Sequence, residues 1–591
     1  MAGGAAAQTY EYRIVLFEPE FVNDPRWVAA AGAEVPQPTS IPDQDALGHI
    51  FTIESSIATA VNDNGVVVGA AYISADLAVT APEPIGLQAF VWQGEPTHPS
   101  LGVNTLNHIP FWNPFNPNGN DLVQDWSIAT DINHDGDVVG YAIERAPGTN
   151  PSAAGLPSDF VEGFIAPIEP GLTPQSIFAM NALTDTFNGG IGGFTSAWGI
   201  TDRDRLTDEV LVAGIGAVDP TGCTLVPYSE PVHWTPRTSN VATELDLLQP
   251  SILPRGEARD IAPRWFEASV DPDVERIIGG ITRTCLVDAD TCSTDQDELV
   301  TGGWELLDPY PVDDVAGGSF WPGGQARGVN SIGNMVGSVT RDVLPGPMVE
   351  CGERAALFTW DPATQSFDLD LLAASPVDPE DETDANAIND SGEIVGLDTF
   401  EFVALRWRPG SVVELNDLVA LGNCGVVSIR SALDVNEHGW IVGVAEVEYP
   451  DDAGMLVPTN IGVLLVPIGD CPEDVDRDGD VDQDDLAAVQ NTLGTGSTSC
   501  NNIRRICWED VNGDCVVNQE DVKLVMKAMT RATCGQQTLS GSLAGLWLDS
   551  GGMERLESGD ESVPAEIESA YGEGSELTTF VNLMILLGEE E

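Results

Sequence analysis

The chain has 591 residues, of which 42% are hydrophobic and 7% aromatic. So much apolar material excludes a wholly disordered chain, and at about 150 residues per domain the length predicts several domains. Lys and Arg total 24 against 94 Asp and Glu, which gives a net charge of −70 at pH 7. A polyanion of this size repels nucleic acid and anionic lipid, and we expect neither as a partner.

The start of the chain contains no intact signal peptide, because neither a basic nor an apolar segment opens it. Ala5–Gln8 is interpreted either as the remnant of a cleaved signal or as part of a disordered terminus. The longest apolar run near the end, Phe580–Leu587, is eight residues long, far short of the ~20 that a membrane span needs. We therefore expect no transmembrane segment. Ten cysteines indicate an oxidising compartment with disulfides, either outside the cell or on its surface.

A short motif recurs through the first four-fifths of the chain. Each clear copy holds a β-branched residue and Asn, a polar turn closed by Gly, and an apolar segment that ends in Gly. Asn and Gly favour tight turns and β-branched residues favour buried strands, so each copy predicts a β-hairpin. The final Gly is expected to permit a close approach between neighbouring sheets. The clear copies are Ala58–Gly69, Ala129–Gly140, Ala326–Gly337, Ala385–Gly396 and Ala432–Gly443, and two weaker ones are Ala197–Gly214 and Ala258–Gly280.

A further strand, often with Trp, follows each hairpin. Clear examples are Ala89–Trp92, Pro231–Trp234, Leu357–Trp360 and Ala404–Trp407. Because the order of hairpin and strand is kept seven times, we predict a mainly β fold, a seven-bladed β-propeller of small antiparallel sheets. The strand Tyr12–Phe17 is expected to complete the last blade and close the ring. A row of β-sandwiches is the alternative fold. For the propeller itself, six or eight blades are the alternatives to seven.

The motif resembles that of the HAF-repeat family, a family of extracellular propeller proteins. The resemblance covers about residues 10–468. It implies the fold and an extracellular location, and it implies little chemistry because that family is defined by its structure rather than by a reaction.

A calcium-loop pattern occurs twice after residue 469. An EF-hand loop places oxygen donors at positions 1, 3, 5, 7, 9 and 12 and Gly at position 6. We predict two Ca²⁺ sites, the second one weaker because Cys515 replaces the turn Gly, where a positive φ strains other residues. The predicted ligands are Asp474, Asp476, Asp478, Asp480 (through its carbonyl), Asp482 and Asp485 in the first loop, and Asp510, Asn512, Asp514, Val516 (through its carbonyl), Asn518 and Asp521 in the second.

Each loop leads into a predicted helix with one apolar face. These faces hold Leu486, Val489 and Leu493 in the first helix and Val522, Val525, Met526 and Met529 in the second. A duplicated loop and helix ending in Asp resembles the type I dockerin family over about residues 471–534. The resemblance implies a small α-helical, EF-hand-like domain whose partner is a cohesin-like or other cell-surface protein. The alternative is that calcium only folds the module and that no partner docks on it.

The positions that would recognise a partner hold Gln483-Asp484 and Gln519-Glu520. They lack the hydroxyl groups of the well-studied dockerins, which implies a different specificity.

Five cysteines fall in the repeats and five in the calcium module. Cys285 with Cys292, and Cys471 with Cys534, are candidate disulfides, although spacing does not fix the connectivity. We predict four segments: a disordered start at 1–9, the propeller at 10–468, the calcium-binding domain at 469–535, and an acidic linker with a short amphipathic helix at 536–591.

No motif for a zinc protease, a nucleotide-binding loop or a nucleophile elbow occurs, and the six histidines are scattered. The catalytic residues stay unknown, because nearly any pair of the 94 Asp and Glu could act as acid and base on the propeller face, and Ca²⁺ is the one cofactor that the sequence predicts. We expect a secreted protein that binds or scaffolds at the cell surface or in an extracellular complex, with polysaccharide as a candidate ligand of the propeller. The alternative is a dockerin-bearing glycoside hydrolase or lyase with its site on the propeller face.

Overall fold

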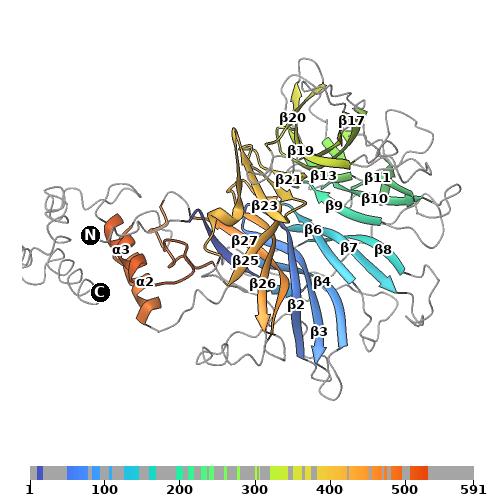
Figure 1. The fold of residues 1–591 in the computed structure, drawn as a ribbon. Coiled ribbons are helices and arrows are strands. Elements are labelled where there is room, and N and C mark those ends of the chain that lie inside the picture. The colour runs from blue at the N-terminus through green and yellow to red at the C-terminus, as the bar shows by residue number, and fades with distance from the viewer. Residues whose placement is uncertain are drawn as a thin grey trace, which may run out of the picture. The chain divides into compact units, whose positions relative to one another are not determined.

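The computed structural model divides the chain into two compact units. Val15–Val466 form the strand-rich unit, and Met1–Ile14 together with Pro467–Glu591 form the helical unit. Figure 1 shows the strands of the first and the two helices of the second. The described residues are 10–17, 50–76, 83–93, 106–108, 126–145, 159–167, 195–203, 210–218, 228–235, 239–244, 258–262, 276–279, 300–301, 305–306, 320–343, 350–361, 366–373, 382–421, 425–450, 455–468, 471–475, 481–494 and 506–529. The predicted disordered start and the predicted acidic tail lie outside them.

The described strands form six four-stranded sheets and one three-stranded sheet. Strands that follow one another within a sheet from β2 to β27 pair antiparallel. In chain order the sheets are β2 (Ile50–Val61), β3 (Val66–Asp76), β4 (Glu83–Gln93) and β5 (Leu106–His108); β6 (Trp126–Ile132), β7 (Asp137–Arg145) and β8 (Asp159–Pro167); β9 (Thr195–Ile200), β10 (Val212–Val218), β11 (Tyr228–Thr235) and β12 (Ser239–Glu244); β13 (Ala258–Ala262), β14 (Arg276–Gly279), β15 (Val300–Thr301) and β16 (Glu305–Leu306); β17 (Phe320–Val329), β18 (Met335–Val343), β19 (Glu350–Asp361) and β20 (Ser366–Leu371); β21 (Thr383–Ile388), β22 (Ile394–Asp398), β23 (Val403–Arg408) and β24 (Ser411–Glu414), followed by the 3-10 helix η3 (Leu415–Leu418); and β25 (Val426–Val435), β26 (Ile441–Pro450) and β27 (Leu456–Pro467), with β1 (Tyr12–Leu16) beside β27.

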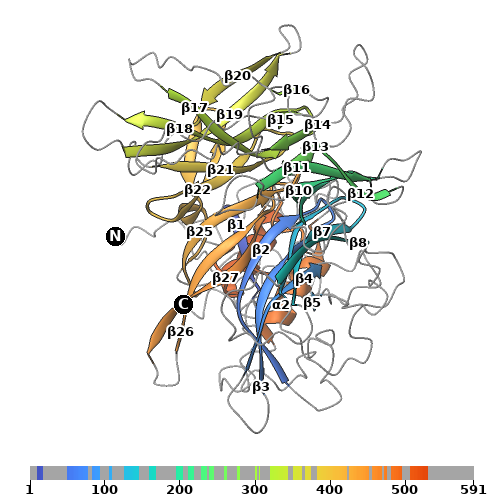
Figure 2. The ribbon, with the colours of Figure 1, turned by 90° about the vertical axis from the view of Figure 1, so that its right-hand side faces the viewer.

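Successive sheets pack against one another in the order of the chain, which Figures 1 and 2 show as neighbouring sheets that change colour from blue to orange. The first strand of each later sheet, from β6 to β25, contacts the sheet before it. β2, the first strand of the first sheet, contacts β25 and β26 of the seventh sheet. The order of packing therefore returns to its starting point.

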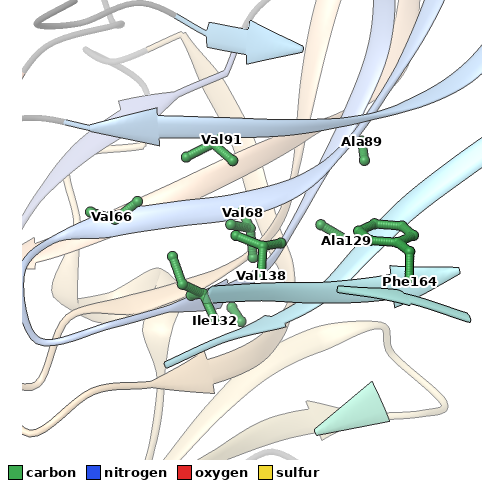
Figure 3. Close-up of a cluster of buried hydrophobic side chains, with 9 residues drawn as sticks. Val66, Val68, Ala89, Val91, Ala129, Ile132, Val138 and Phe164 are labelled. Carbon is green, nitrogen blue, oxygen red and sulfur yellow. The ribbon is translucent and has the colours of Figure 1, made fainter. Parts of the chain in front are cut away.

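Apolar side chains fill the space between neighbouring sheets. Val68 of the first sheet and Val138 of the second meet there (Figure 3), and both are fully buried. The predicted Trp strands are third strands of their sheets, and Trp92, Trp234 and Trp407 are among the largest fully buried side chains. Burying one such side chain contributes about 1.5–3 kcal/mol or more, so the recurrent Trp is explained by packing.

In the five clear copies of the motif, the Asn links two sheets. The Oδ1 of Asn62 accepts hydrogen bonds from the backbone N–H groups of its own turn, including Val66 at 3.0 Å. Its Nδ2 donates to the carbonyl of Asn133 in the next sheet at 2.9 Å. Asn436 of the seventh sheet donates in the same way to the carbonyl of Asn62 at 3.0 Å. The amide carries an acceptor and a donor on separate atoms, so one Asn side chain closes its own turn and links the next sheet.

A β-bulge interrupts the same pairing in every sheet. In the sixth sheet the register shifts between Ala385 and Ala387, and the other six sheets shift at the matching place. The bulge brings the carbonyl of Asp384 so close to Gly396 that a Cβ there would overlap it. The prediction that this Gly serves contact between sheets is therefore wrong, because the crowding atom belongs to the neighbouring strand of the same sheet. Gly69, Gly140, Gly214 and Gly443 face the carbonyls of Ile57, Ile128, Ser196 and Ser431 in the same way.

Candidate metal centre

Both predicted helices of the calcium module are present, and each begins at position 10 of its twelve-residue loop. They are α2 (Gln483–Gly494) and α3 (Gln519–Ala528). The predicted apolar faces pack into one core, in which Val489, Val522 and Val525 are at most 1% exposed. None of the helices in the described part of the chain is long and apolar enough to cross a lipid bilayer.

Loop positions 9 and 12 start the second helix. Asn518 at position 9 is the N-cap, and its Oδ1 accepts from the N–H of Glu520 at 2.7 Å. Asp521 at position 12 accepts from the N–H of Asn518 at 2.8 Å, which completes a capping box. The spacing that predicts calcium ligands therefore also sets the beginning of the helix.

The first loop shows the same arrangement where it is described. Asp485 accepts from the N–H of Asp482 at 2.7 Å and from that of Val475 at 2.6 Å. The matching contact in the second loop joins Asp521 to the N–H of Val511 at 2.9 Å. Position 12 thus holds both ends of each loop together. The predicted ligands Asp476, Asp478 and Asp480 lie outside the described residues.

The carboxylates of the second loop face backbone N–H groups inside it. Asp510 accepts from Asp514 at 3.0 Å and from Cys515 at 2.7 Å, and Asp514 accepts from Val516 at 2.9 Å. Asp510 is 2% exposed and Asp521 is fully buried. In the described part of the chain, no three Asp, Glu, His or Cys side chains lie close enough together to hold an ion by themselves.

Burial raises the pKa of Asp510 to about 6, with a smaller contribution from Asp514 and an opposing one from the hydrogen bond of Cys515 and from Arg13. Burial also raises the pKa of Asp521 to about 7, and repulsion from Asp510 and Asp514 adds to the rise. Carboxylates that are buried close to one another favour the proton because their charges are desolvated and repel. A bound cation would offset the same repulsion.

Cys515 has a φ of 65°, in the left-handed region where the loop pattern expects Gly. The prediction of a positive φ at this residue is confirmed. Cys515, Cys471 and Cys507 are disulfide-bonded. The other candidate disulfide residues, Cys285, Cys292 and Cys534, lie outside the described residues.

The strand-rich unit contains a group of carboxylates that sequence reasoning missed. Asp131, Asp260 and Asp434 directly follow the bulge in their sheets, and each joins two sheets. Asp260, for example, accepts from the N–H of Ile261 at 2.7 Å and from that of Val329, in the next sheet, at 2.9 Å. The signal in the sequence is that the other four copies carry a small residue here, namely Ala60, Gly199, Gly328 and Ala387.

The charges of these three carboxylates repel one another. Burial raises the pKa of Asp131 well above its ordinary value, and the charges of Asp260 and Asp434 add to the rise. The pKa of Asp260 is raised to about 7 and that of Asp434 to about 6, in both cases mainly by burial.

We expect the strand-rich unit to lose stability as the pH rises. The pKa of Asp260 is about 7 in the folded chain against an ordinary value of 3.8, so folding takes up a proton between these values. The contribution of Asp260 to stability is therefore fully present below about pH 4 and is lost as the pH rises through about 7. Melting temperatures between pH 4 and 8 measure this slope, and Asp260→Asn should flatten it. A slope that is the same in the variant and the parent would contradict the assignment.

Residues 472–530 match the family model of the dockerin type I domain. No curated protein is similar enough to the chain to count as a relative. Among solved structures, the polysaccharide lyase Uly1 shares 9% identity at a TM-score of 0.37, over 78% of this chain and 99% of the lyase. A polysaccharide lyase of family PL25, an ulvan lyase, shares 8% at 0.31, over 69% and 94% of the two chains. The tricorn protease shares 10% at 0.31, over 79% and 41%. At such scores these likenesses carry no weight for fold or activity.

Proposed function

We propose that this is a secreted protein whose calcium-loaded dockerin module tethers a β-propeller to a cohesin-type partner in an extracellular complex or at the cell surface. The observation that carries the proposal is the agreement between the dockerin match at 472–530 and the twin loops. In both loops the carboxylate at position 12 accepts from the N–H at position 2 and holds the loop at the start of a helix.

The donor set of these loops fits Ca²⁺. Carboxylate, amide and carbonyl oxygens are hard ligands, and six of them along a twelve-residue loop match the coordination number and flexible geometry of this ion. We assign the second loop as the weaker site, since Cys515 takes the position of the turn Gly. When bound, Ca²⁺ supplies a positive charge that compensates the buried negative charges of Asp510 and Asp521. The assigned ligands are Asp474, Asp476, Asp478, Asp480, Asp482 and Asp485, and Asp510, Asn512, Asp514, Val516, Asn518 and Asp521.

We assign the seven sheets of the strand-rich unit as the blades of a closed propeller of the HAF-repeat type. The return of the packing order to β2 and the hydrogen bond from Asn436 back to Asn62 at 3.0 Å support this assignment. Ser56 of the first sheet adds support, because it donates to the carbonyl of Phe17 at 2.6 Å and accepts from the N–H of Gly462 at 2.8 Å. We propose binding of a polysaccharide or protein, rather than catalysis, as the role of this unit.

Capture of the full-length protein on a panel of immobilised cohesin domains tests the tether. We expect capture with Ca²⁺, release by a chelator and recapture when Ca²⁺ is restored. The double variant Asp485→Ala, Asp521→Ala should abolish capture. Gln483→Ser with Gln519→Ser should change which cohesin binds while the calcium affinity stays the same, since neither side chain is an assigned ligand. Capture that persists in chelator would overturn the tether. Failure of every cohesin to capture a protein that binds Ca²⁺ would overturn it as well.

A further inference from the structure

The helical unit includes residues from the far end of the chain. Arg13, on β1, is only 2% exposed. Its Nε donates a hydrogen bond of 2.8 Å to the backbone carbonyl of Asp510, 497 positions later. Its guanidinium carbon lies 5.2 Å from the centroid of the Trp508 ring, a cation–π contact. The side chain therefore fits against Asp510, position 1 of the second calcium loop, and against Trp508, two residues before it.

The backbone around Arg13 is held in the same unit. The carbonyl of Glu11 accepts from the N–H of Ile468 at 2.9 Å. Gly513, inside the second loop, has a φ of 71°, and a Cβ at this position would overlap Ile468 and lie 3.4 Å from the carbonyl oxygen of Tyr12. Residues 11–13 thus pack closely on the loop, and Gly513 permits this approach.

We propose that Arg13 is a positioning residue of the second calcium loop. Asp510 is position 1 of that loop, and its two carboxylate oxygens accept from Asp514 and Cys515 inside the loop. Arg13 binds the carbonyl of Asp510 and leaves these oxygens to the loop. A charge-assisted hydrogen bond is stronger than a neutral one, and the planar guanidinium holds the carbonyl and the indole at once. The dockerin-type module of this protein therefore extends beyond residues 472–530 and is completed by the N-terminal strand.

The inference rests on the proposed calcium function. It predicts an effect of Arg13 on calcium affinity that is opposite to the effect expected from its charge alone. A positive charge beside a cation site repels the cation, so removal of Arg13 should strengthen calcium binding if charge were its only effect. If Arg13 positions Asp510, its removal should weaken binding. If Arg13 only adds packing energy, its removal lowers the melting temperature and leaves the calcium affinity unchanged.

Calorimetric calcium titration of the full-length protein separates these cases. The background is Asp485→Ala, which disables the first loop and leaves the second to be measured. We expect Arg13→Met, which keeps an apolar stem, to weaken calcium binding about tenfold, as the loss of one hydrogen bond to a charged group implies. Arg13→Lys keeps the charge but lacks the planar donor, and it should also weaken binding. Arg430→Met is the matched control, since it removes the same charge from an ion pair with Glu446 in the strand-rich unit.

The fluorescence of Trp508 gives a second readout. The calcium-induced signal that disappears in Trp508→Phe belongs to this ring, and it should be smaller in Arg13→Lys than in the parent. If Arg13→Met does not fold, Arg13→Lys alone decides. Unchanged or stronger calcium binding by the Lys variant would overturn the positioning role and leave the calcium site standing. If the parent itself binds no Ca²⁺, the proposed function fails instead.

Discussion

Gly396→Ala should destabilise the strand-rich unit by about 3 kcal/mol or more, an unusually large cost for the addition of one methyl group. Gly396 ends the repeated motif, and its Cα faces the carbonyl of Asp384, which the β-bulge pushes toward it. A Cβ would overlap that oxygen, and the backbone must move for the two to fit. Urea denaturation followed by Trp fluorescence measures the loss.

Gly392→Ala is the matched control in the same hairpin. Gly392 has a φ of 78°, but no atom lies within 4 Å of where its Cβ would be. Its replacement therefore costs only the left-handed strain of about 1–2 kcal/mol. Equal losses in the two variants would show that backbone conformation, and not the crowding carbonyl, explains the repeated Gly.

Removal of calcium should unfold the helical unit over residues 471–534 and leave the strand-rich unit folded. Without the ion, Asp510 and Asp521 remain buried near Asp514, and their raised pKa values show how unfavourable their charges are at neutral pH. Limited proteolysis with and without chelator measures the effect, with the cleavage sites located by mass spectrometry. We expect new cleavage within 471–534 and none in the described strands.

Two neighbouring residues of α3 supply the control for this prediction. Asp521→Ala removes a proposed ligand and one half of the capping box, so it should expose the segment to protease even in calcium. Glu520→Ala removes an exposed carboxylate that pairs with Lys523 at 3.1 Å, and it should leave protection by calcium intact. Protection in chelator equal to that in calcium would contradict the assignment of the loops.

The sequence predicts local features well because the repeated motif is itself local. Asn62 and Gly65 mark a tight turn, and the turn, the hairpin and the Trp strand that follows are all present. The role of Gly69 was misjudged because the carbonyl of Ile57 reaches it only through a bulge. A bulge depends on the pairing of two strands and leaves no distinct mark on either strand alone.

Long-range contacts explain the rest of what the sequence did not predict. Asp260 interacts with Asp131 and Asp434 because the packing of the sheets brings equivalent positions of the second, fourth and seventh sheets within electrostatic reach, and nothing in one copy of the motif specifies that distance. In the calcium module, the spacing from Asp510 to Asp521 predicts both the loop and the start of α3. Arg13 was missed because its partner is at the other end of the chain, and one isolated Arg near the start has no motif around it.

The position of β1 has a consequence for how the protein is made. Translation releases the amino end first, so β1 emerges long before β27, the strand beside which it lies. Until the last repeat is out, the seventh sheet cannot be completed, and afterwards β27 has an open edge until β1 is added. Open edges recruit strands from other molecules. A chain that lacks β1 would therefore leave β27 with an open edge on which a strand of another copy can add.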